Sequence, residues 1–452
     1  MTRPTTAPPE QRLHDALEAA LAKLPPGPLL VALSGGLDSS VLLRALAETG
    51  SVRTRGLRAI HVDHGLQGSS ADWAEHCRRL CLDLNVPLSV VRVDVERGGA
   101  EGPEGVARRA RYAAFTRALR ESEILTLAHH RGDQAETVLL KLLRGAGPEG
   151  LGAMRTLRPF ASGAIWRPLL GLPHALLRAC AEAWGAQWVD DPSNFDTSFD
   201  RNYVRHDILP RLIHRWPEAE SSIAQSATWS RAAAAFIDEE ATAALAQVQG
   251  LDPRTLDFGR WLALPEALRD PVLRQWLRDI GLPGPTHFQA SELVRQLAEA
   301  GEDRQPCVSW PGTEVRRYRG LLHALAPLPA MPGGWQAMFS GAPVELPGGA
   351  GTLALVSRQA GGRQPHLSTP LLVTFRRGGE SMRPTGENHV RELRELFQSA
   401  GITPWWRGRL PLLIDRHGHL LAVADLWQSD DGAALLAAAN ARIDWRPTDT
   451  AH

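Results

Sequence analysis

Cysteine, lysine and long apolar runs are scarce in this chain of 452 residues, and each scarcity excludes a class of protein. The 4 cysteines, Cys77, Cys81, Cys180 and Cys307, are too few for a disulfide scaffold, and no two have the two-residue spacing of a zinc or redox motif. No run of about 18 apolar residues predicts a membrane-spanning helix. The polar, proline-bearing start MTRPTTAPPEQ lacks the apolar core of a signal peptide. We therefore expect a cytoplasmic protein with no membrane segment.

Net charge is also absent, because 50 Lys and Arg residues balance 50 Asp and Glu residues. A polyanion would therefore have to bind a local basic patch rather than the whole surface. Lysine occurs only at Lys23 and Lys141, so such a patch would consist of arginine. The excess of arginine over lysine does not by itself indicate a function, because a GC-rich genome gives the same bias.

Short β-rich runs alternate with longer helix-like segments between residues 28 and 188. This alternation is typical of parallel βαβ units, and it predicts an α/β fold with a doubly wound, mostly parallel sheet of the Rossmann-like kind. Ligands of such sheets bind outside the carboxyl ends of the strands. The β-rich runs are PLLVALS, GLRAIHVDH, LSVVRVDV, EILTLAH and AIWRPLL.

The composition changes along the chain and predicts four segments. Residues 1–215 form the α/β domain, and residues 216–330 are alanine-rich and predict a helical domain with no comparable β-rich run before about residue 308. Residues 331–368 are dense in proline and glycine, which predicts a linker or a loop-rich junction. Residues 369–452 mix β-like runs with a helix-like stretch and predict a small α+β domain.

The strongest local signal is the segment SGGLDSS, which follows a strand-like run and precedes a helix-like one. Glycines let successive backbone N–H groups point at an anion, and the following helix N-terminus adds positive charge. The segment differs from a P-loop, because no lysine follows the glycines. An ordinary glycine turn capped by Asp and Ser is the alternative. The candidate phosphate-binding residues are Ser34, Gly35, Gly36, Leu37, Asp38, Ser39 and Ser40, with Asp38 also a candidate Mg²⁺ ligand.

SGGLDSS resembles the PP-loop of the N-type ATP pyrophosphatases, which cleave ATP to AMP and pyrophosphate. Further motifs at both ends of the chain resemble the tRNA(Ile)-lysidine synthase family, whereas the middle region matches only by position. These motifs are HVDHGL at residues 61–66, LAHHRGDQAETVLLKLLRGAGPEGL at 127–151, RPLL at 167–170, WVDDPSNFDTSFDRNYVR at 188–205, FRRGGE at 375–380 and VRELRELFQSAGITPWWRGRLPLLID at 390–415.

This resemblance implies a ligase that forms a carbon–nitrogen bond. It implies ATP-dependent attachment of L-lysine to C2 of the wobble cytidine in the CAU anticodon of tRNA(Ile), through an adenylated cytidine, with release of AMP and pyrophosphate. ATP and Mg²⁺ are then the cofactors, and tRNA(Ile) and L-lysine the partners. The α/β domain would be catalytic, and the helical and C-terminal domains would contact tRNA.

Asp133 and Glu136 are three residues apart at the start of a helix-like segment, so both can face the ATP site. We expect them, with Asp38 and Arg111, to be catalytic, through contact with lysine or the metal. The alternative is that they only offset the helix macrodipole. Whether either carboxylate acts as a base or only positions lysine stays open at this point.

The resemblance also implies that His130 lines the nucleotide pocket. Arg108 and Arg111, about one helical turn apart, are candidate ligands of phosphate or of the lysine carboxylate. A structural histidine and a solvated helix face are the respective alternatives. Trp405 and Trp406 are candidates for stacking on RNA bases, although core packing is the commoner role. The candidate RNA contacts are Arg201, Asn202, Arg205, Arg376, Arg377, Arg391 and Arg394.

Two positions depart from the family pattern: Gly132 stands where aspartate is common, and Gln67 where arginine is common. The first removes a possible ligand for the metal or for lysine, and the second removes a possible phosphate contact. A PP-loop tRNA sulfurtransferase and a non-catalytic tRNA-binding protein are the alternative functions. The first needs a reactive cysteine or iron–sulfur ligands, whereas Cys77 and Cys81 read as buried thiols of a helix. The oligomeric state stays open, with a homodimer among the options, as does the rejection of tRNA(Met).

Overall fold

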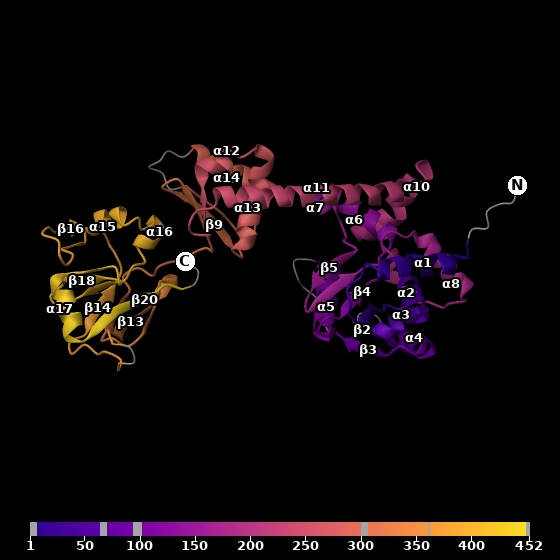
Figure 1. Ribbon diagram of the computed structural model, residues 1–452, viewed down its shortest axis with the longest axis horizontal. Helices are drawn as coiled ribbons and strands as arrows, with labels where there is room; N and C mark the ends of the chain where they lie inside the picture. Colours follow the sequence, from indigo (N-terminus) through magenta and orange to yellow (C-terminus); the bar gives the residue numbers. More distant parts are fainter. Residues whose placement is uncertain (1–6, 64–69, 94–101, 300–305, 360–361, 449–452) are drawn as a thin grey trace. The chain divides into compact units, whose positions relative to one another are not determined.

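The computed structural model describes residues 7–63, 70–93, 102–299, 306–359 and 362–448 (Figure 1). The chain divides into two compact units, Met1–Phe236 and Ile237–His452. None of the helices in the described ranges is both long enough and apolar enough to cross a membrane. Gln67, one of the two departures from the family pattern, lies outside the described residues.

Unit 1 contains a six-stranded sheet of order β3-β2-β1-β4-β6-β5. All neighbours pair in parallel except β5, which forms an antiparallel hairpin with β6. The predicted doubly wound, mostly parallel sheet is confirmed. Strand β5 was missed, because its sequence LRPF contains proline and carries no buried alternation. The strands are β1 (Leu29–Ala32), β2 (Leu57–Asp63), β3 (Leu88–Arg92), β4 (Ile124–Thr126), β5 (Leu157–Phe160) and β6 (Gly163–Trp166).

Helices cover both faces of this sheet, which is why its central strands are apolar on both sides (Figure 1). In β1, Leu29 and Val31 join the core formed with α1 (Pro9–Leu21), α2 (Leu37–Glu48) and α8 (His174–Ala183). Leu30 joins the core formed with α5 (Gly102–Ala118). The helices before the last strands are α1 (Pro9–Leu21), α2 (Leu37–Glu48), α3 (Gly50–Arg55), α4 (Ser70–Asp83), α5 (Gly102–Ala118), α6 (Arg131–Leu143) and α7 (Pro148–Leu151).

Short turns of helix follow the sheet and lead into one long helix. The turn η2 (Val204–Ile208) is π-helical, a form that occurs frequently at functional sites. Helix α11 (Ala219–Val248) has 30 residues, and its alanine-rich sequence favours a helix of this length. The other elements here are α8 (His174–Ala183), η1 (Pro192–Phe195), α9 (Asp200–Tyr203) and α10 (Leu209–Arg215).

The first part of unit 2 contains the predicted helices and also an antiparallel sheet that was not expected. The sheet has the order β7-β10-β9-β8, and β7 is only 3 residues long, too short to give a periodic signal. Val308 and Trp310 of β8 point into the core shared with these helices. The elements are β7 (Thr255–Asp257), α12 (Phe258–Ala263), α13 (Glu266–Asp279), α14 (His287–Glu299), β8 (Cys307–Trp310), β9 (Thr313–Tyr318) and β10 (Leu321–Leu325).

Residues 331–368, predicted as a linker or a loop-rich junction, supply the strands β11, β12 and β13 between their turns. Strand β11 pairs with β14, and β13 pairs with β20, so the segment belongs to the C-terminal sheets. The glycines lie in the turns between strands, where Gly341 and Gly348 have positive φ angles of 119° and 64°. The segment contains β11 (Gln336–Phe339), β12 (Val344–Leu346), η3 (Pro347–Gly349) and β13 (Gly351–Ser357).

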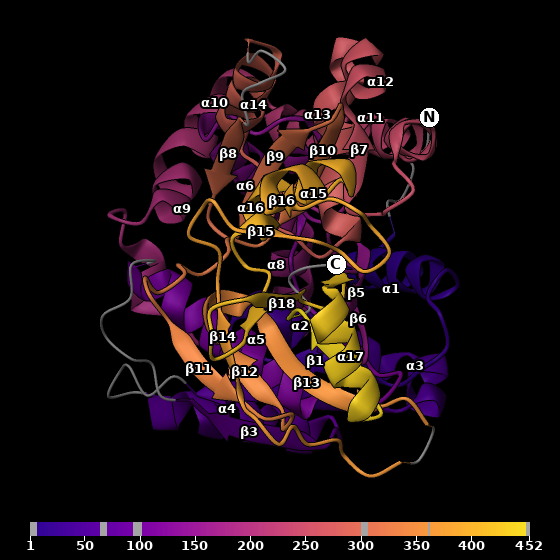
Figure 2. The same cartoon turned by 90° about the vertical axis from the view of Figure 1, so that its left-hand side faces the viewer.

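The rest of unit 2 is the predicted small α+β fold. Helix α17 (Asp430–Ala438) packs against β18 and β20 through Leu436 (Figure 2). Two sheets, β11-β14-β17-β18-β19 and β12-β13-β20, enclose this core. The remaining elements are β14 (Leu371–Thr374), β15 (Ser381–Met382), β16 (Arg391–Glu392), α15 (Leu393–Ser399), α16 (Pro404–Arg407), β17 (Leu412–Ile414), β18 (Leu420–Val423), β19 (Trp427–Gln428) and β20 (Ala441–Arg446).

A buried ion pair between Arg58 and Glu123 joins β2 to the start of β4, opposite the strands' carboxyl ends. Both guanidinium nitrogens Nε and Nη2 lie 2.6 Å from the two carboxylate oxygens, and Glu123 is only 1% exposed. Burial alone would raise the pKa of Glu123, but the Arg58 hydrogen bonds and the Arg120 backbone N–H outweigh it and lower this pKa. The pair therefore contributes its full stabilisation of the folded state at pH values above the pKa of this carboxyl in the unfolded chain. The contribution is lost as the pH falls through the lower pKa of the folded state.

Replacing Glu123 by Gln should lower the free energy of unfolding by about 3 kcal/mol, because it leaves the Arg58 guanidinium buried without a counter-charge. Urea unfolding at neutral pH measures the change. Glu75→Gln is the matched control, since Glu75 forms an exposed pair with Arg78 and should change stability by less than about 1 kcal/mol. Equal effects of the two substitutions would contradict the expectation.

Candidate functional site

The segment SGGLDSS forms a tight loop between β1 and α2. Ser34 and Ser39 hold it closed, with their Oγ atoms 3.0 Å apart and the Ser34 N–H donating to Ser39 Oγ at 3.2 Å. Gly35 has a φ of 88°, and a Cβ atom there would lie 3.2 Å from Cys77 Sγ. Gly36 N–H donates to Ser34 Oγ at 3.3 Å. The loop therefore needs glycine at position 35 for both its backbone conformation and its close approach to α4.

The N-terminus of α2 is open for an anion. Its first residue follows Gly36, and no side chain among the described residues caps it. The Ser40 hydroxyl is buried and has no hydrogen-bond partner in the described part of the chain. Buried polar atoms normally have a partner, so an orphaned hydroxyl beside an uncapped helix start fits a phosphate oxygen well.

A cavity of about 940 Å³ opens beside this loop, at the carboxyl ends of the strands. It is where a ligand of a doubly wound sheet is expected. Among the predicted residues of unit 1, Gly35, Ser40 and Arg201 do not line this cavity. The four predicted arginines Arg376, Arg377, Arg391 and Arg394 belong to unit 2. Neither lysine of the chain lines it. The predicted residues on its wall are Ser34, Gly36, Leu37, Asp38, Ser39, Arg108, Arg111, His130, Asp133, Glu136, Asn202 and Arg205.

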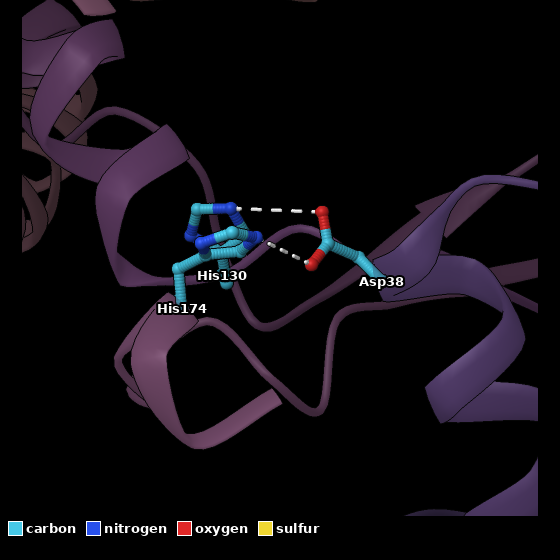
Figure 3. Close-up of side chains that lie close together, drawn as sticks. All are labelled: Asp38, His130 and His174. Carbon is cyan, nitrogen blue, oxygen red and sulfur yellow. Dashed lines mark ion pairs between the residues drawn. The ribbon is translucent and has the colours of Figure 1, made fainter. Parts of the chain in front are cut away.

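Asp38 points into this cavity and meets two histidines (Figure 3). Its Oδ1 lies 3.2 Å from His174 Nε2, and its Oδ2 lies 3.7 Å from His130 Nε2. The hydrogen bond to Asp38 raises the pKa of His174 above the ordinary value, against the opposing effect of burial. His174, at the start of α8, was missed, because no spacing or motif in the sequence links it to Asp38.

The orientation of the His130 ring is fixed by the start of α6. Its Nδ1 accepts the Gly132 N–H at 3.0 Å, while the Asp133 carboxylate accepts the His130 N–H at 3.0 Å, which together form a capping box. With Nδ1 as an acceptor, the ring proton lies on Nε2, the nitrogen that faces Asp38. A Cβ atom at Gly132 would lie 2.8 Å from His130 Cε1. Glycine at this position therefore leaves room for the ring.

Asp38, His130 and His174 offer three ligand atoms within 4.8 Å of one another. Mg²⁺ prefers oxygen ligands, so only the Asp38 carboxylate of this group suits it, together with phosphate oxygens. The imidazoles fit the ion less well, because His130 would have to give up its Nε2 proton to coordinate a metal. The arrangement thus fits an ion held by one carboxylate and a bound triphosphate.

Asp133 and Glu136 lie together on α6, as their spacing predicts, and both are paired with arginines of α9 and η2. Arg201 Nε lies 2.8 Å from Glu136 Oε2, and Arg205 Nε lies 2.6 Å from Glu136 Oε1. Both guanidinium groups also reach Asp133 Oδ1, at 3.3 and 3.0 Å. Two carboxylates and two guanidinium groups therefore form one compact network without net charge.

The charges around Asp133 keep it ionised. Burial alone would raise the pKa of Asp133, but the positively charged guanidinium groups of Arg201 and Arg205 outweigh burial and lower it. The neighbouring His129 has the opposite balance, since burial lowers its pKa to about 3. His129 is therefore uncharged, and its Nδ1 accepts a hydrogen bond of 3.2 Å from the buried Arg167.

Several predicted contacts have protein partners. The buried Asn202 amide donates to the carbonyls of Ser193 and Asp196 at 2.8 and 2.9 Å, so it holds the turn η1. The Arg108 guanidinium lies 4.9 Å from the centre of the Tyr112 ring. The RNA contact of Asn202 and the substrate contacts of Arg108 and Arg111 stay predictions.

The candidate RNA contacts of unit 2 lie near the elements β14 to α15. Arg377 and Arg394 are exposed, whereas Arg376 lies 3.5 Å from Glu380 and Arg391 lies 3.4 Å from Glu387. The two tryptophans are half-buried and contact other rings of unit 2, as the packing alternative predicts: Trp405 contacts Tyr318 and His323, and Trp406 contacts Trp445.

Comparison with known proteins places the whole chain in one family. A PP-loop domain model matches residues 9–212, a TilS substrate binding domain matches 256–323, and a TilS substrate C-terminal domain matches 371–445. The tRNA(Ile)-lysidine synthase of Xanthomonas axonopodis pv. citri is 43% identical over 94% of this chain and 96% of its own. That of Pseudomonas aeruginosa is 40% identical over 88% of this chain and 89% of its own. This chain belongs to the tRNA(Ile)-lysidine synthase family.

Membership of the tRNA(Ile)-lysidine synthase family confirms the resemblance that the motifs indicated. The PP-loop domain implies that the protein uses ATP. The family match also covers residues 256–323, where the sequence alone gave only a positional assignment. The mixed helix-and-sheet part of unit 2 is therefore a family domain rather than an insertion.

The three cysteines of unit 1 do not provide the reactive thiol that a sulfurtransferase needs. Cys77 and Cys81 lie in the core of unit 1, as predicted, and burial raises their pKa values to about 12 and 11. Burial also raises the pKa of Cys180 to about 11. Cys307 is the exposed cysteine, and it lies in unit 2.

Titration of the folded protein with a disulfide reagent at pH 8 should therefore modify one thiol, that of Cys307, and titration after unfolding should modify all 4. The reagent thiolate that each modified cysteine releases is measured by its absorbance. Cys307→Ser should abolish the rapid reaction of the folded protein. Rapid modification of a second thiol in the folded state would contradict the burial of Cys77, Cys81 and Cys180.

Proposed function

We propose that this protein is an RNA-modifying ligase that attaches L-lysine to C2 of the wobble cytidine of tRNA(Ile) with the CAU anticodon. The observation that carries the proposal is a single cavity lined both by an ATP-type phosphate loop and by Asp133, Glu136 and Arg205. This cavity lies in a chain that matches the family's domains in order. The product is lysidine.

The first step joins the cytidine to AMP. The cytosine O2 attacks the α-phosphorus of ATP, a new P–O bond forms, and the bond to pyrophosphate breaks. The N–H groups at the start of α2 would bind the phosphate oxygens and stabilise the growing charge. Mg²⁺ held by Asp38 would supply further neutralisation of the departing pyrophosphate.

The second step forms the carbon–nitrogen bond. The lysine ε-amine attacks C2, AMP leaves, and the nitrogen loses a proton. A free ε-ammonium has a pKa of about 10.4, so the site must orient lysine and accept its proton. Asp133 is a poor proton acceptor because its pKa is lowered. We assign Asp133 to positioning the ammonium group, and we propose that the Glu136 carboxylate, one turn further along α6, accepts the proton when the amine attacks.

Arginines of unit 2, namely Arg376, Arg377, Arg391 and Arg394, are the proposed RNA-phosphate contacts, and residues 256–323 are proposed to contact tRNA as well. Arg201 and Arg205 are proposed to act at the lysine site instead, because their guanidinium groups are already directed to Asp133 and Glu136. Action in the cytoplasm and assembly as a homodimer remain predictions.

Incubation with ATP, Mg²⁺ and labelled lysine should place label on tRNA(Ile) with the CAU anticodon and not on tRNA(Met). The mass of the isolated nucleoside identifies lysidine. Asp38→Asn should lower the rate at least about 100-fold, because it removes charge stabilisation at the pyrophosphate. Asp83→Asn, an exposed carboxylate of α4, is the matched control and should be unaffected.

Release of AMP without lysine incorporation would support an adenylating site and overturn the assignment of lysine as the substrate. Full activity of Asp38→Asn would overturn the role of Asp38. If the wild type binds tRNA but neither releases AMP nor incorporates lysine, the protein is a tRNA-binding protein without this activity.

Glu136→Gln should lower kcat/KM for lysine at least about tenfold, because one carboxylate of the network is lost and the Arg205 guanidinium keeps no full counter-charge. Initial rates at varied lysine measure the change, and a thermal melt checks folding. Glu149→Gln, an exposed carboxylate of α7, serves as the control. If Glu136→Gln and the control Glu149→Gln have the same KM for lysine and the same kcat, Glu136 does not act at the lysine site.

A further inference from the structure

Phe195 is an exposed aromatic ring on the wall of the cavity. It is 65% exposed, although it lines the same cavity as the PP-loop. Exposed rings are unremarkable singly, but a ring held at the wall of a substrate cavity provides a face for a planar ligand.

Hydrogen bonds fix the backbone on both sides of Phe195. Asp191 Oδ1 accepts the Ser193 N–H at 2.8 Å, which caps the turn η1. The buried Asn202 amide donates to the carbonyls of Ser193 and Asp196, and these two residues bracket Phe195. The exposed ring therefore stands on a braced turn rather than on a free loop.

A second ring supports the first. The Phe195 and His206 rings are stacked, with centroids 5.6 Å apart and planes inclined by 23°. His206 Nε2 lies 2.8 Å from the carbonyl of Asn194, which fixes the imidazole plane. His206 also lines the cavity. The pair forms a two-ring surface with one phenyl face supported by the imidazole.

Two connections tie this surface to the reacting groups. His206 follows Arg205 in the π-helical turn η2, and Arg205 donates to Glu136 at 2.6 Å. At the other end of the same segment, the Val189 N–H donates to the Gly35 carbonyl of the PP-loop at 3.0 Å. The residues from Val189 to His206 therefore run from the phosphate loop through Phe195 to the acidic network.

We propose that Phe195, supported by His206, is the stacking surface for the unpaired pyrimidine base that reacts in this cavity. The inference rests on the proposed function and names the part of the site that receives the base. Proteins that read single-stranded RNA stack splayed bases on aromatic rings, because every base has a π face. Stacking would orient the cytosine O2 toward the ATP site without any base-edge contact.

A fluorescent cytosine analogue at the wobble position of tRNA(Ile) tests the proposal without ATP. Wild-type protein should change its fluorescence on binding, because a neighbouring ring perturbs a stacked base. Phe195→Leu should lose this change and lower kcat/KM for tRNA about tenfold or more, while KM for ATP stays unchanged. Phe195→Tyr should retain both properties, since it keeps the ring.

Phe236→Leu is the matched control, because Phe236 is 63% exposed on α11 and does not line the cavity. It should leave the fluorescence change and the kinetics unaltered. The proposal is overturned if Phe195→Leu keeps the fluorescence change, or if its kcat/KM for tRNA stays within about twofold of wild type. It is equally overturned if KM for ATP rises together with KM for tRNA, which would indicate a general disturbance of the loop.

The fluorescence arm also separates this inference from the function on which it rests. A wild-type protein that changes the probe's fluorescence but makes no lysidine would overturn the proposed function and support the stacking surface. If the wild type makes lysidine and Phe195→Leu shows the same fluorescence change and the same kinetics, only the proposal of the stacking surface is overturned.

Discussion

The network of Asp133, Glu136, Arg201 and Arg205 is the interaction on which the cavity depends. It joins α6 to the short helical turns about 70 residues later, with contacts of 2.6 to 3.3 Å. Burying a single carboxylate such as Glu136 without these guanidinium groups would be strongly unfavourable. The same contacts place η2, and with it the segment that carries Phe195, beside the PP-loop. A charge balance within the network thus determines where the wall of the cavity lies.

Much of the fold could be predicted because the β-rich runs of unit 1 are short, apolar and bounded by polar residues. The PP-loop could be located for a similar reason, since Gly35 and Gly36 stand between a strand and a helix and few other roles need that pattern. The strands of residues 336–357 could not be predicted. Their prolines and glycines indicate turns, and the strands between them are stabilised by partners such as β20, which lies almost 90 residues later.

The site was predicted only in part, because side-chain pairing over long sequence separations leaves no local signal. Asp133 and Glu136 were found from their helical spacing, but their pairing with Arg201 and Arg205 follows from the tertiary fold. His174 belongs to the same class, since only the fold brings it to Asp38. Gly132 is different: the departure from the family pattern was visible, but its meaning, space for the His130 ring, needed coordinates.

The absence of lysine from the cavity wall has a consequence for chemical fidelity. An activated cytidine is an electrophile, and any primary amine held beside it would compete with the intended one. The cations on this wall are guanidinium and imidazole groups, and a guanidinium stays protonated and therefore unreactive at neutral pH. Lys23 and Lys141 lie elsewhere in the unit. If the protein acts as proposed, the guanidinium groups on this wall cannot become cross-linked to the activated RNA in place of the free amino acid.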